Sequence, residues 1–390
     1  MWRLLVPQLD NDTGVPMKLR FGCLAILMTV SAPALAQSSV TIYGIISDGI
    51  GYFSNQSGSS TVQLVSGANQ NNRLGFRINE DIGGGWATVA TLENGFDINQ
   101  GKFGQGGRMF GRQAFVGLSS RTYGTLTIGR QYDVLWDYLD RIEPQAMGPG
   151  LATSIGSNDN IEGNFRYSNS VKYKSPEWNG LEFETLYAFS NKAGAFQQNR
   201  AFSAGINYTW GGQRYAVTYL NIDHPGTANP SGAVSDDYSG GAFQLFHTSP
   251  VNSSVGVERQ RVVAGGAEYA FGNTRLGGIV SDVRYSYLDG TSLHLNNFDL
   301  TAVYNVSPAL ALSAAYVYSM GHYGGIDASS HWNQGQLSVD YFLSKRTDLY
   351  AYVNYVKATG PLATAVLFLA SAPSSNKEQT AVVAGIRHRF

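Results

Sequence analysis

The chain has 390 residues, only 14% of which are charged, and its 27 basic side chains almost balance its 28 acidic ones. This balance argues against a nucleic-acid partner, which would leave a strongly basic footprint on the composition. Glycine (46 residues), tyrosine (23) and phenylalanine (19) are abundant and proline is sparse, which is an unusual composition for a soluble protein.

The first predicted element is a secretory signal peptide over residues 1–36. A basic start, the apolar run FGCLAILMTV and a small-x-small cleavage signal ending at Ala36 give this pattern. Met17 is the expected true start, and residues 1–16 are interpreted as an over-extended beginning. The apolar run is shorter than the roughly 20 residues that a spanning helix needs. Cleavage would also remove Cys23, so the mature chain can form neither a disulfide nor a thiolate metal site.

The mature composition narrows the fold class. A secreted chain that is rich in glycine and tyrosine, weakly charged and free of cysteine is typical of an outer-membrane β-barrel. A large secreted β-solenoid fits the same composition, so periodicity has to decide between them. No mature segment is continuously apolar for 18 residues, which excludes a helical membrane protein.

Residues 37–390 are predicted to form one all-β domain, because alternating segments and turns continue without a linker. Tilted strands that cross a bilayer need about 9 to 11 residues each. We predict sixteen antiparallel strands of roughly this length, near residues 40–53, 72–80, 86–97, 111–119, 125–131, 168–174, 181–190, 201–210, 214–222, 258–271, 275–287, 294–305, 310–320, 332–342, 348–357 and 379–390.

The connections alternate between very short turns and longer polar loops. Turns such as residues 81–85 and 211–213 are rich in Gly, Asn and Ser, as turn geometry requires. The long connections, such as residues 223–257, all fall on the opposite end. This is the up-and-down plan of an outer-membrane barrel. Such a barrel must pair its last strand with its first, near VTIYG, so that no edge meets lipid.

The alternation within single strands supports the same plan. In the segment LEFETLYAF, Leu181 and Phe183 share one face while Glu182 and Glu184 share the other. A period of two with one apolar and one polar face is what a strand between lipid and water needs. A soluble β-sandwich would also alternate, but it would not need segments of such uniform length.

The longest acidic stretch lies between two hairpin patterns, from Gln131 to Ser168. A loop of more than about 15 residues without periodicity of its own is uncommon and usually functional. We predict that it folds back into a pore. Its acidic residues are Asp133, Asp137, Asp140, Glu143, Asp159 and Glu162.

A set of arginines is expected to face this loop. Arg73 and Arg77 share a face in the second strand, and arginine on the lipid side costs roughly 2 to 4 kcal/mol near the midplane, so both must face the lumen. Arg112 would join them from a neighbouring strand. Cations opposite anions set a transverse field that discriminates solutes by charge. The expected acidic partners are Asp133, Asp137, Asp140 and Glu143. The alternative is a solvated rim of salt bridges, and the side of Arg130, at a strand end, stays open.

Several motifs in order carry a family resemblance. QSSVTIYG, RLGFRINEDIGGGWATVATLENGFD, GRQAFVGLSS followed by GTLTIGRQYD, and the terminal GIRHRF resemble the trimeric general-diffusion porins of Gram-negative outer membranes, most of all the betaproteobacterial type. The similarity covers essentially the whole mature chain. It implies a sixteen-stranded transmembrane barrel, a homotrimer, and a third loop that narrows the lumen as an eyelet.

The resemblance also implies roles for single residues. The arginine wall of the family falls on Arg73, Arg77 and Arg112, and the terminal Phe390 matches the aromatic end that outer-membrane assembly machinery recognises. The first strand departs from the family pattern, because Ser47, followed by Asp48, stands where an aspartate is usual. The implied surroundings are outer-membrane lipid and lipopolysaccharide, and the trimer contact is expected on short apolar strands near the two termini.

Enzymatic readings find no support in the sequence. The six histidines have no metal-ligand spacing. The segment GFDINQGKF fails the phosphate-loop pattern, because Phe96 stands where glycine is needed and Phe103 follows the lysine. No Ser/His or Asp/His set clusters at the expected barrel rim. We therefore expect no catalytic residue, no cofactor and no metal.

The predicted function is a water-filled outer-membrane channel through which ions and small hydrophilic solutes diffuse passively. Two alternatives stay open at this stage. One is a substrate-selective channel, and the other is a non-conducting surface adhesin or structural barrel. Arginines and carboxylates oppose each other at distances that the sequence does not define, so neither the sign of ion selectivity nor a preferred solute follows from it.

Overall fold

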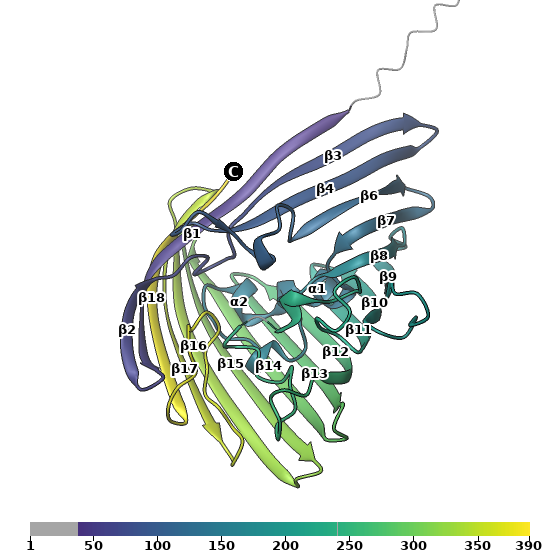
Figure 1. Cartoon of the computed structure of the whole chain (residues 1–390). Helices are drawn as coiled ribbons and strands as arrows, with labels where there is room; N and C mark the ends of the chain where they lie inside the picture. The colour runs from purple at the N-terminus through teal and green to yellow at the C-terminus, as the bar shows by residue number, and fades with distance from the viewer. Residues whose placement is uncertain (1–37, 240) are drawn as a thin grey trace, which may run out of the picture. The chain divides into compact units, whose positions relative to one another are not determined.

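The computed structural model describes residues 38–390 except residue 240. The expected signal peptide lies outside the described residues. Eighteen strands are described, and sixteen of them form an antiparallel sheet in which each pairs with the next one along the chain; β2 pairs only with β1 and β5 only with β4. β1 and β18 also pair, with Ile45 opposite Arg389 and Phe53 opposite Ala381, and this pairing closes the sheet into a barrel (Figure 1).

Sixteen long strands build the barrel wall. They are β1 (Ser39–Gln56), β3 (Arg73–Gly83), β4 (Trp86–Asp97), β6 (Gln113–Ser120), β7 (Gly124–Gln131), β8 (Tyr167–Lys174), β9 (Leu181–Ala188), β10 (Arg200–Trp210), β11 (Gln213–Asp223), β12 (Val257–Phe271), β13 (Thr274–Tyr287), β14 (Ser292–Ser307), β15 (Leu310–Gly324), β16 (Ala328–Phe342), β17 (Thr347–Thr359) and β18 (Glu378–Arg389). Each predicted segment corresponds to one of them, so the predicted sixteen-stranded barrel is confirmed.

Two further strands lie where loops were expected. β2 (Ser59–Leu64) folds back on β1 through a tight turn at Ser57 and Gly58, which have positive φ angles of 53° and 103°. β5 (Lys102–Phe103) makes a two-residue pairing with the end of β4. Glycine adopts positive φ without a steric penalty, which allows β1 to continue directly into this extra hairpin.

The two faces of the wall differ as the alternation predicts. On β9, Phe183 is 39% exposed whereas the neighbouring Glu184 is 2% exposed. On β16, Leu337 is 62% exposed and Gln336 is 3% exposed. Because successive side chains of a strand point to opposite faces, the apolar set lies on the outside and the polar set fills the inside of the barrel.

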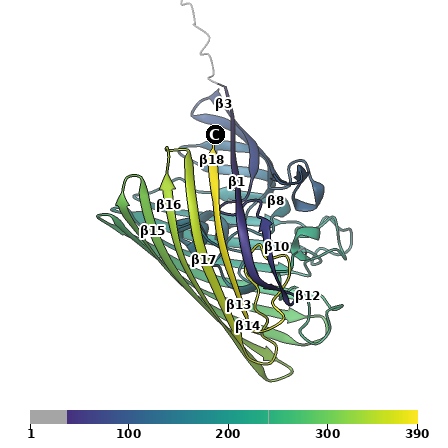
Figure 2. The ribbon, with the colours of Figure 1, turned by 90° about the vertical axis from the view of Figure 1, so that its left-hand side faces the viewer.

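The wall is uneven in height. The strands β6 to β9 have eight residues each, whereas β12 to β16 have between 14 and 16. Figure 1 shows the short strands, and Figure 2 shows the long, tilted strands β13 to β17 from the side. This difference distinguishes one part of the outer surface from the rest.

Helical turns lie only in connections between strands, among the residues that the structure describes. They are η1 (Gln105–Gly107), α1 (Val134–Leu139), η2 (Asp140–Ile142), α2 (Pro144–Met147), η3 (Ile155–Ser157) and η4 (Asp236–Ser239). In the described part of the chain, no helix has the length and apolar character needed to cross a membrane. Four of the six turns belong to one connection, residues 132–166, which we call loop L3.

Candidate pore constriction

Loop L3 lies inside the barrel, held by side chains that point inward from distant strands. The backbone N–H of Val134 donates to Ser203 Oγ on β10 at 3.3 Å. Near the middle of the loop, the N–H of Leu151 donates to Asn354 Oδ1 on β17 at 3.0 Å. Because β10 and β17 are far apart in the wall, the loop must cross the lumen (Figure 1). This confirms the prediction that it folds back into the barrel.

The return path of L3 is attached to a third part of the wall. The carbonyl of Asn158 accepts hydrogen bonds from Gln260 Nε2 on β12 at 2.8 Å and from the Tyr285 hydroxyl on β13 at 2.9 Å. Its side chain pairs with Asn297 on β14. A buried loop has no strand ladder to satisfy its backbone groups, so inward-facing amides and hydroxyls replace the ladder. The loop is therefore an ordered partition in the barrel.

A cavity of about 300 Å³ separates L3 from one side of the wall. Two acidic residues of the loop, Asp140 and Glu162, line it. The wall contributes four arginines, which are Arg73, Arg112, Arg387 and Arg389. Positive charge from the wall thus faces negative charge from the loop, which is the arrangement expected of a narrow, charge-discriminating passage.

Two of the four arginines are neutralised locally. Arg112 is 2% exposed, and its Nε lies 2.7 Å from Glu93 Oε1. Arg387 Nε lies 3.1 Å from Asp348 Oδ1, and its Nη2 lies 3.6 Å from Asp340 Oδ2. Each of these two cations is therefore compensated by carboxylates of the wall.

The other two arginines are not paired directly with a carboxylate. Within residues 38–239 and 241–390, neither Arg73 nor Arg389 takes part in an ion pair. Arg73 Nε donates to the carbonyl of Asn71 at 3.1 Å, which orients the side chain without cancelling its charge. Both guanidinium groups line the cavity, so a mobile anion there would meet positive charge.

The expected arginine wall is divided between two cavities. Arg73 and Arg112 line the cavity described above, whereas Arg77 lines a separate one of about 520 Å³ together with Asp137 and Lys172. The guanidinium of Arg77 lies over the ring of Tyr43, 4.8 Å from its centroid. Such a contact holds the arginine against the wall. The role of Arg77 in a constriction stays a prediction.

The four expected acidic residues occupy different surroundings. Only Asp140 lines the cavity with the uncompensated arginines. Asp133 is 1% exposed and caps α1, accepting from the Trp136 N–H at 3.0 Å. Asp137 pairs with Lys172 on β8, and Glu143 is fully buried in the loop. An irregular loop has no periodicity from which the direction of each acidic side chain could be predicted.

Burial changes the titration of the loop carboxyls. Burial raises the pKa of Asp140 to about 6, although the neighbouring guanidinium groups of Arg73 and Arg112 act in the opposite direction. Burial also raises the pKa of Asp133 to about 6. Low dielectric disfavours the charged form of a carboxyl, and nearby cations favour it. Asp140 therefore loses its charge under mildly acidic conditions.

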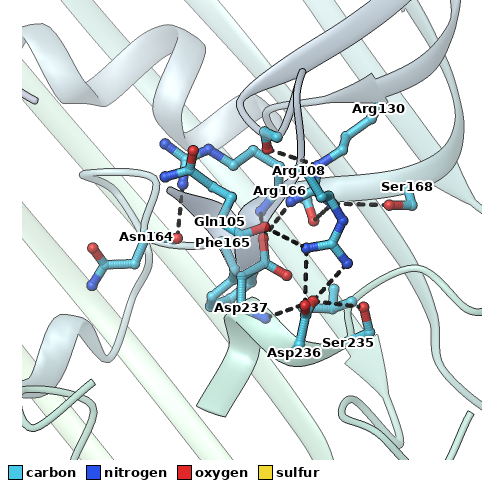
Figure 3. A network of polar contacts seen from close by, with 12 residues as sticks. Gln105, Arg108, Arg130, Asn164, Phe165, Arg166, Ser168, Ser235, Asp236 and Asp237 are labelled. Carbon is cyan, nitrogen blue, oxygen red and sulfur yellow. Dashed lines mark hydrogen bonds and ion pairs between the residues drawn. The ribbon is translucent and has the colours of Figure 1, made fainter. Parts of the chain in front are cut away.

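A second ion-pair network connects three loops (Figure 3). Arg130, whose side the sequence left open, points inward and pairs with Asp237 of the loop 224–256, which we call L5. Next to it, Arg108 of the loop between β4 and β6 lies 2.7 Å from Asp236. The N–H of Arg166 in L3 also donates to Asp237, at 3.4 Å. These contacts fix L5 over the inner loop.

The sequence did not single out several residues that line the arginine cavity. Alternation placed Arg387 and Arg389 on one face of the last strand, but only the closing pair β1 and β18 brings them beside the second strand. Arg387 and Arg389 could have been found from the sequence by combining their shared face on the last strand with the expected pairing of that strand with the first. Phe368 and Leu369 of the loop between β17 and β18 also line the cavity, and nothing in the sequence marks these two.

Phe390 and Ser47, which the sequence analysis singled out, both lie where β1 pairs with β18 and closes the barrel. The backbone of Phe390 exchanges hydrogen bonds with that of Gly44, at 3.0 and 3.1 Å, so the chain end completes the seam. Ser47 is fully buried, and its hydroxyl lies 3.1 Å from that of Tyr350 on β17. Asp48 lies on the opposite face of β1, where its carboxylate accepts from Asn99 at 3.3 Å. At the position where an aspartate is usual in the family, the inner face of β1 therefore carries the hydroxyl of Ser47.

Comparison with known proteins decides the family. A family model described as Gram-negative porin matches residues 23–361. This chain belongs to the Gram-negative porin family. The porin is 32% identical to an outer membrane porin protein of Bordetella pertussis, over 96% of this chain and all of the relative.

Two solved structures are also similar to this porin. The anion-selective porin from Comamonas acidovorans has a TM-score of 0.73 at 23% identity and covers 91% of this chain, with all of that chain covered. A trimer form of OmpT from Vibrio cholerae has a TM-score of 0.65 at 14% identity, covering 90% of this chain and 99% of that one. The TM-scores show that the fold is shared, and at identities below 25% the likeness shows the fold alone. The family match and the Bordetella relative place this porin in the Gram-negative outer membrane as a channel for passive diffusion.

Proposed function

We propose that this porin favours anions and that the arginine-lined cavity is its selecting element. The observation that carries the proposal is the lining itself, in which two arginines without an ion pair, Arg73 and Arg389, face Asp140 and Glu162, while burial raises the pKa of Glu162 and so favours its neutral form. Arg73 and Arg389 contribute positive charge that no ion pair compensates among the described residues. The expected basic wall would then include Arg73 and Arg112, extended by the two arginines of the last strand.

The physical basis is the concentration of an electric field in a narrow passage. Low-dielectric walls focus the potential of fixed charges into a cleft and raise the local concentration of counter-ions. The barrel interior provides such walls, and L3 narrows the space in which the field acts. Solutes still move only down their concentration gradients, so charge changes their relative rates and not the direction of transport.

The proposal is tested by single-channel recording of the refolded porin in a planar bilayer. The reversal potential under a salt gradient measures the ratio of anion to cation permeability. We expect the sign that corresponds to faster anions. A reversal potential of the opposite sign would show that Asp140 and the other carboxylates control the passage.

The same recordings distinguish the two alternative functions. A substrate-selective channel would show saturable block of its current by one sugar, phosphate or amino acid. A surface adhesin or structural barrel would show no conductance although the protein is verified as folded. The match to the Gram-negative porin family favours a channel over a non-conducting barrel.

We further infer that three copies associate through the short wall formed by β6 to β9, and not through strands near the two termini as the family resemblance implied. Eight residues per strand are fewer than the roughly 9 to 11 that a lipid-crossing strand needs. This wall nevertheless exposes large apolar side chains, with Leu118 46% and Leu126 49% exposed. An apolar surface too short for lipid is suited to contact with another protein. Three similar short walls meeting at one axis would produce a homotrimer.

A further inference from the structure

An aromatic side chain of loop L3 borders the arginine-lined cavity and has no part in the proposed charge selection. Trp136 of α1 is partly exposed and lines this cavity together with Arg73 and Arg112. Its indole stacks on the ring of Tyr132, with the two centroids 3.9 Å apart and the planes 12° from parallel. Because Tyr132 covers one face of the indole, the part of Trp136 that borders the cavity is its other face or an edge. The cavity therefore has an aromatic surface beside its arginines.

The same stacked pair connects the indole to the cations. The guanidinium of Arg112 lies over the ring of Tyr132, 5.7 Å from its centroid, and that of Arg166 lies 4.7 Å from the same centroid. The indole of Trp136 and the guanidinium of Arg112 are therefore no farther apart than the sum of 3.9 and 5.7 Å. Cation–π contacts are attractive and hold the tyrosine ring in place. The aromatic surface of the cavity thus has a defined position relative to Arg112.

Arg112 in turn packs beside the strand position of Arg73. Gly95 on β4 is directly opposite Arg73 on β3. The side chain of Arg112 lies against Gly95, where an added Cβ atom would be 3.1 Å from Arg112 Cδ. The absence of a side chain at Gly95 therefore lets Arg112 approach the position of Arg73. Arg73 is not paired directly with a carboxylate within the described residues, so an anion drawn to it comes close to the aromatic pair as well.

A second aromatic side chain borders the cavity from another loop. Phe368, in the loop between β17 and β18, lines it together with Leu369. The ring of Phe368 packs edge-to-face against Phe243 of L5, with the centroids 5.3 Å apart. The lining thus combines guanidinium groups of the barrel wall with aromatic and aliphatic side chains of two loops. An inorganic anion would use only the guanidinium groups, whereas an anion with an apolar body would use both kinds of surface.

We propose that this cavity is a binding subsite for aromatic carboxylates in which a single ring carries the carboxylate directly. A carboxylate accepts hydrogen bonds from a guanidinium at about 2.8 Å, and aromatic rings pack with their centroids about 4.5 to 7 Å apart. An anion such as benzoate can therefore contact Arg73 or Arg112 with one end and Trp136 with the other. The cavity volume of about 300 Å³ is at the lower end of the range for small-molecule sites, which suits one ring. The inference rests on the proposed anion preference, because the same arginines attract the carboxylate.

Such a subsite retains one class of anion without closing the channel to others. Chloride contacts only the guanidinium groups and passes with weak retention, whereas an aromatic carboxylate stays longer and reduces the chloride current while it is bound. Asp140 and Glu162 line the same cavity. Like charges brought together are unfavourable, so a ligand with one carboxylate is preferred over a ligand with two. Aromatic monocarboxylates are therefore the substrate class that the lining fits.

The experiment compares benzoate with cyclohexanecarboxylate as blockers of the single-channel chloride current of the refolded full-length porin. Both anions have the same charge and nearly the same size, but only benzoate has an aromatic ring. Aromatic contacts add roughly a factor of two to ten in affinity beyond apolar burial. We therefore expect the concentration of benzoate that halves the current to be at least about twofold lower. Equal half-blocking concentrations of the two anions would overturn the proposal.

Variants of one tryptophan assign the effect to a side chain. Trp136→Leu keeps an apolar side chain without the ring, so benzoate and cyclohexanecarboxylate should then block equally. Trp136→Phe keeps a ring and should keep the preference for benzoate. The matched control is Trp178→Leu, which changes a tryptophan that is 52% exposed outside the cavity and should behave as the wild type. The chloride conductance of each variant shows that it is folded and inserted. A preference for benzoate that persists in Trp136→Leu would overturn the proposal.

Two further readouts separate the subsite from the proposed anion preference. Arg73→Gln should raise the half-blocking concentrations of both anions and leave their ratio unchanged, because both carry the same charge. The reversal potential in KCl reports the anion preference, whereas the ratio between the two anions reports only the aromatic contact. A cation-preferring channel that still binds benzoate more tightly would overturn the proposed function alone. An anion-preferring channel that both anions block equally would overturn the subsite alone.

Discussion

Arg73 and Arg389 lie at the same level of the barrel wall, with Ile45 between them. Ile45 on β1 is opposite Arg389 on β18 and opposite Arg73 on β3. Neighbouring strands are about 4.8 Å apart, so the two arginine backbones are separated by roughly 10 Å. Both side chains line the same cavity. The seam that closes the barrel therefore concentrates positive charge opposite L3.

The first prediction concerns this pair of arginines. Replacing both, as Arg73→Gln and Arg389→Gln in one chain, removes the uncompensated charge and should lower the ratio of anion to cation permeability at least about twofold. The measurement is the reversal potential under a salt gradient. Arg121→Gln, in an exposed turn between β6 and β7, is the control and should behave as the wild type. An unchanged ratio in the double variant would refute the assignment of selectivity to this cavity.

The second prediction follows from the titration of Asp140. Its pKa is raised to about 6, so lowering the pH from 7.5 to 5 converts the carboxylate to the neutral acid. The cavity then carries more net positive charge, and the preference for anions should increase. Asp140→Asn should show the acidic selectivity already at pH 7.5 and a smaller response to pH. A pH response of equal size in this variant would show that other groups titrate in the passage.

The third prediction compares how much the two ion pairs Arg130–Asp237 and Arg108–Asp236 contribute to holding L5 in place. The side chains of Arg130 and Asp237 are 8% and 6% exposed, whereas those of Arg108 and Asp236 are 34% and 45% exposed. Removing one partner of a buried pair leaves an uncompensated charge and costs about 3 to 5 kcal/mol, while an exposed pair contributes about 0 to 1 kcal/mol. Asp237→Asn should therefore loosen L5 far more than Asp236→Asn.

Limited proteolysis with chymotrypsin measures this difference, because Tyr238, Phe243 and Phe246 of L5 are buried in the intact protein. Cleavage requires local opening, so its rate follows the free energy of opening. We expect at least about tenfold faster cleavage in Asp237→Asn and less than about fivefold in Asp236→Asn. Equal cleavage rates in the two variants would mean that the buried pair does not hold the loop.

The fourth prediction tests the short wall as the contact between copies. Leu126→Arg places a charge on the outer face of β7 and should convert the proposed trimer into monomers, because an unpaired charge in an apolar interface is strongly unfavourable. Light scattering of the detergent complex gives the number of copies. The control is Leu337→Arg on the long strand β16, which should stay trimeric. Dissociation by the control alone would move the contact to the long-stranded face.

The elements of the barrel followed from the sequence because their signals are local. Alternation in segments such as Leu181 to Ala188 depends only on the period of a strand, and turn residues define where each strand ends. The orientation of Arg73 followed from the cost of placing it in lipid. Such signals need no knowledge of which strands lie side by side.

The surroundings of the acidic side chains in L3 could not be predicted from local sequence patterns. Asp133, Asp137, Asp140 and Glu143 were expected to act as one acidic face, yet one caps a helix, one pairs with Lys172, one faces the arginines and one is fully buried. An irregular segment has no period that assigns directions to its side chains. Their environments depend instead on which lumen-facing donors hold the backbone in place.

The sequence by itself determined the sixteen strands of the barrel wall, their inner and outer faces, the long inner loop and the family resemblance, because each depends on residues that are close in the chain. Only the tertiary structure decided that Arg387 and Arg389 join Arg73, and that Asn158 of L3 accepts a hydrogen bond from Gln260 of β12. These groupings arise from closure of the sheet and from a loop that crosses the lumen. Closure and crossing bring together residues that are hundreds of positions apart, so no local pattern records them.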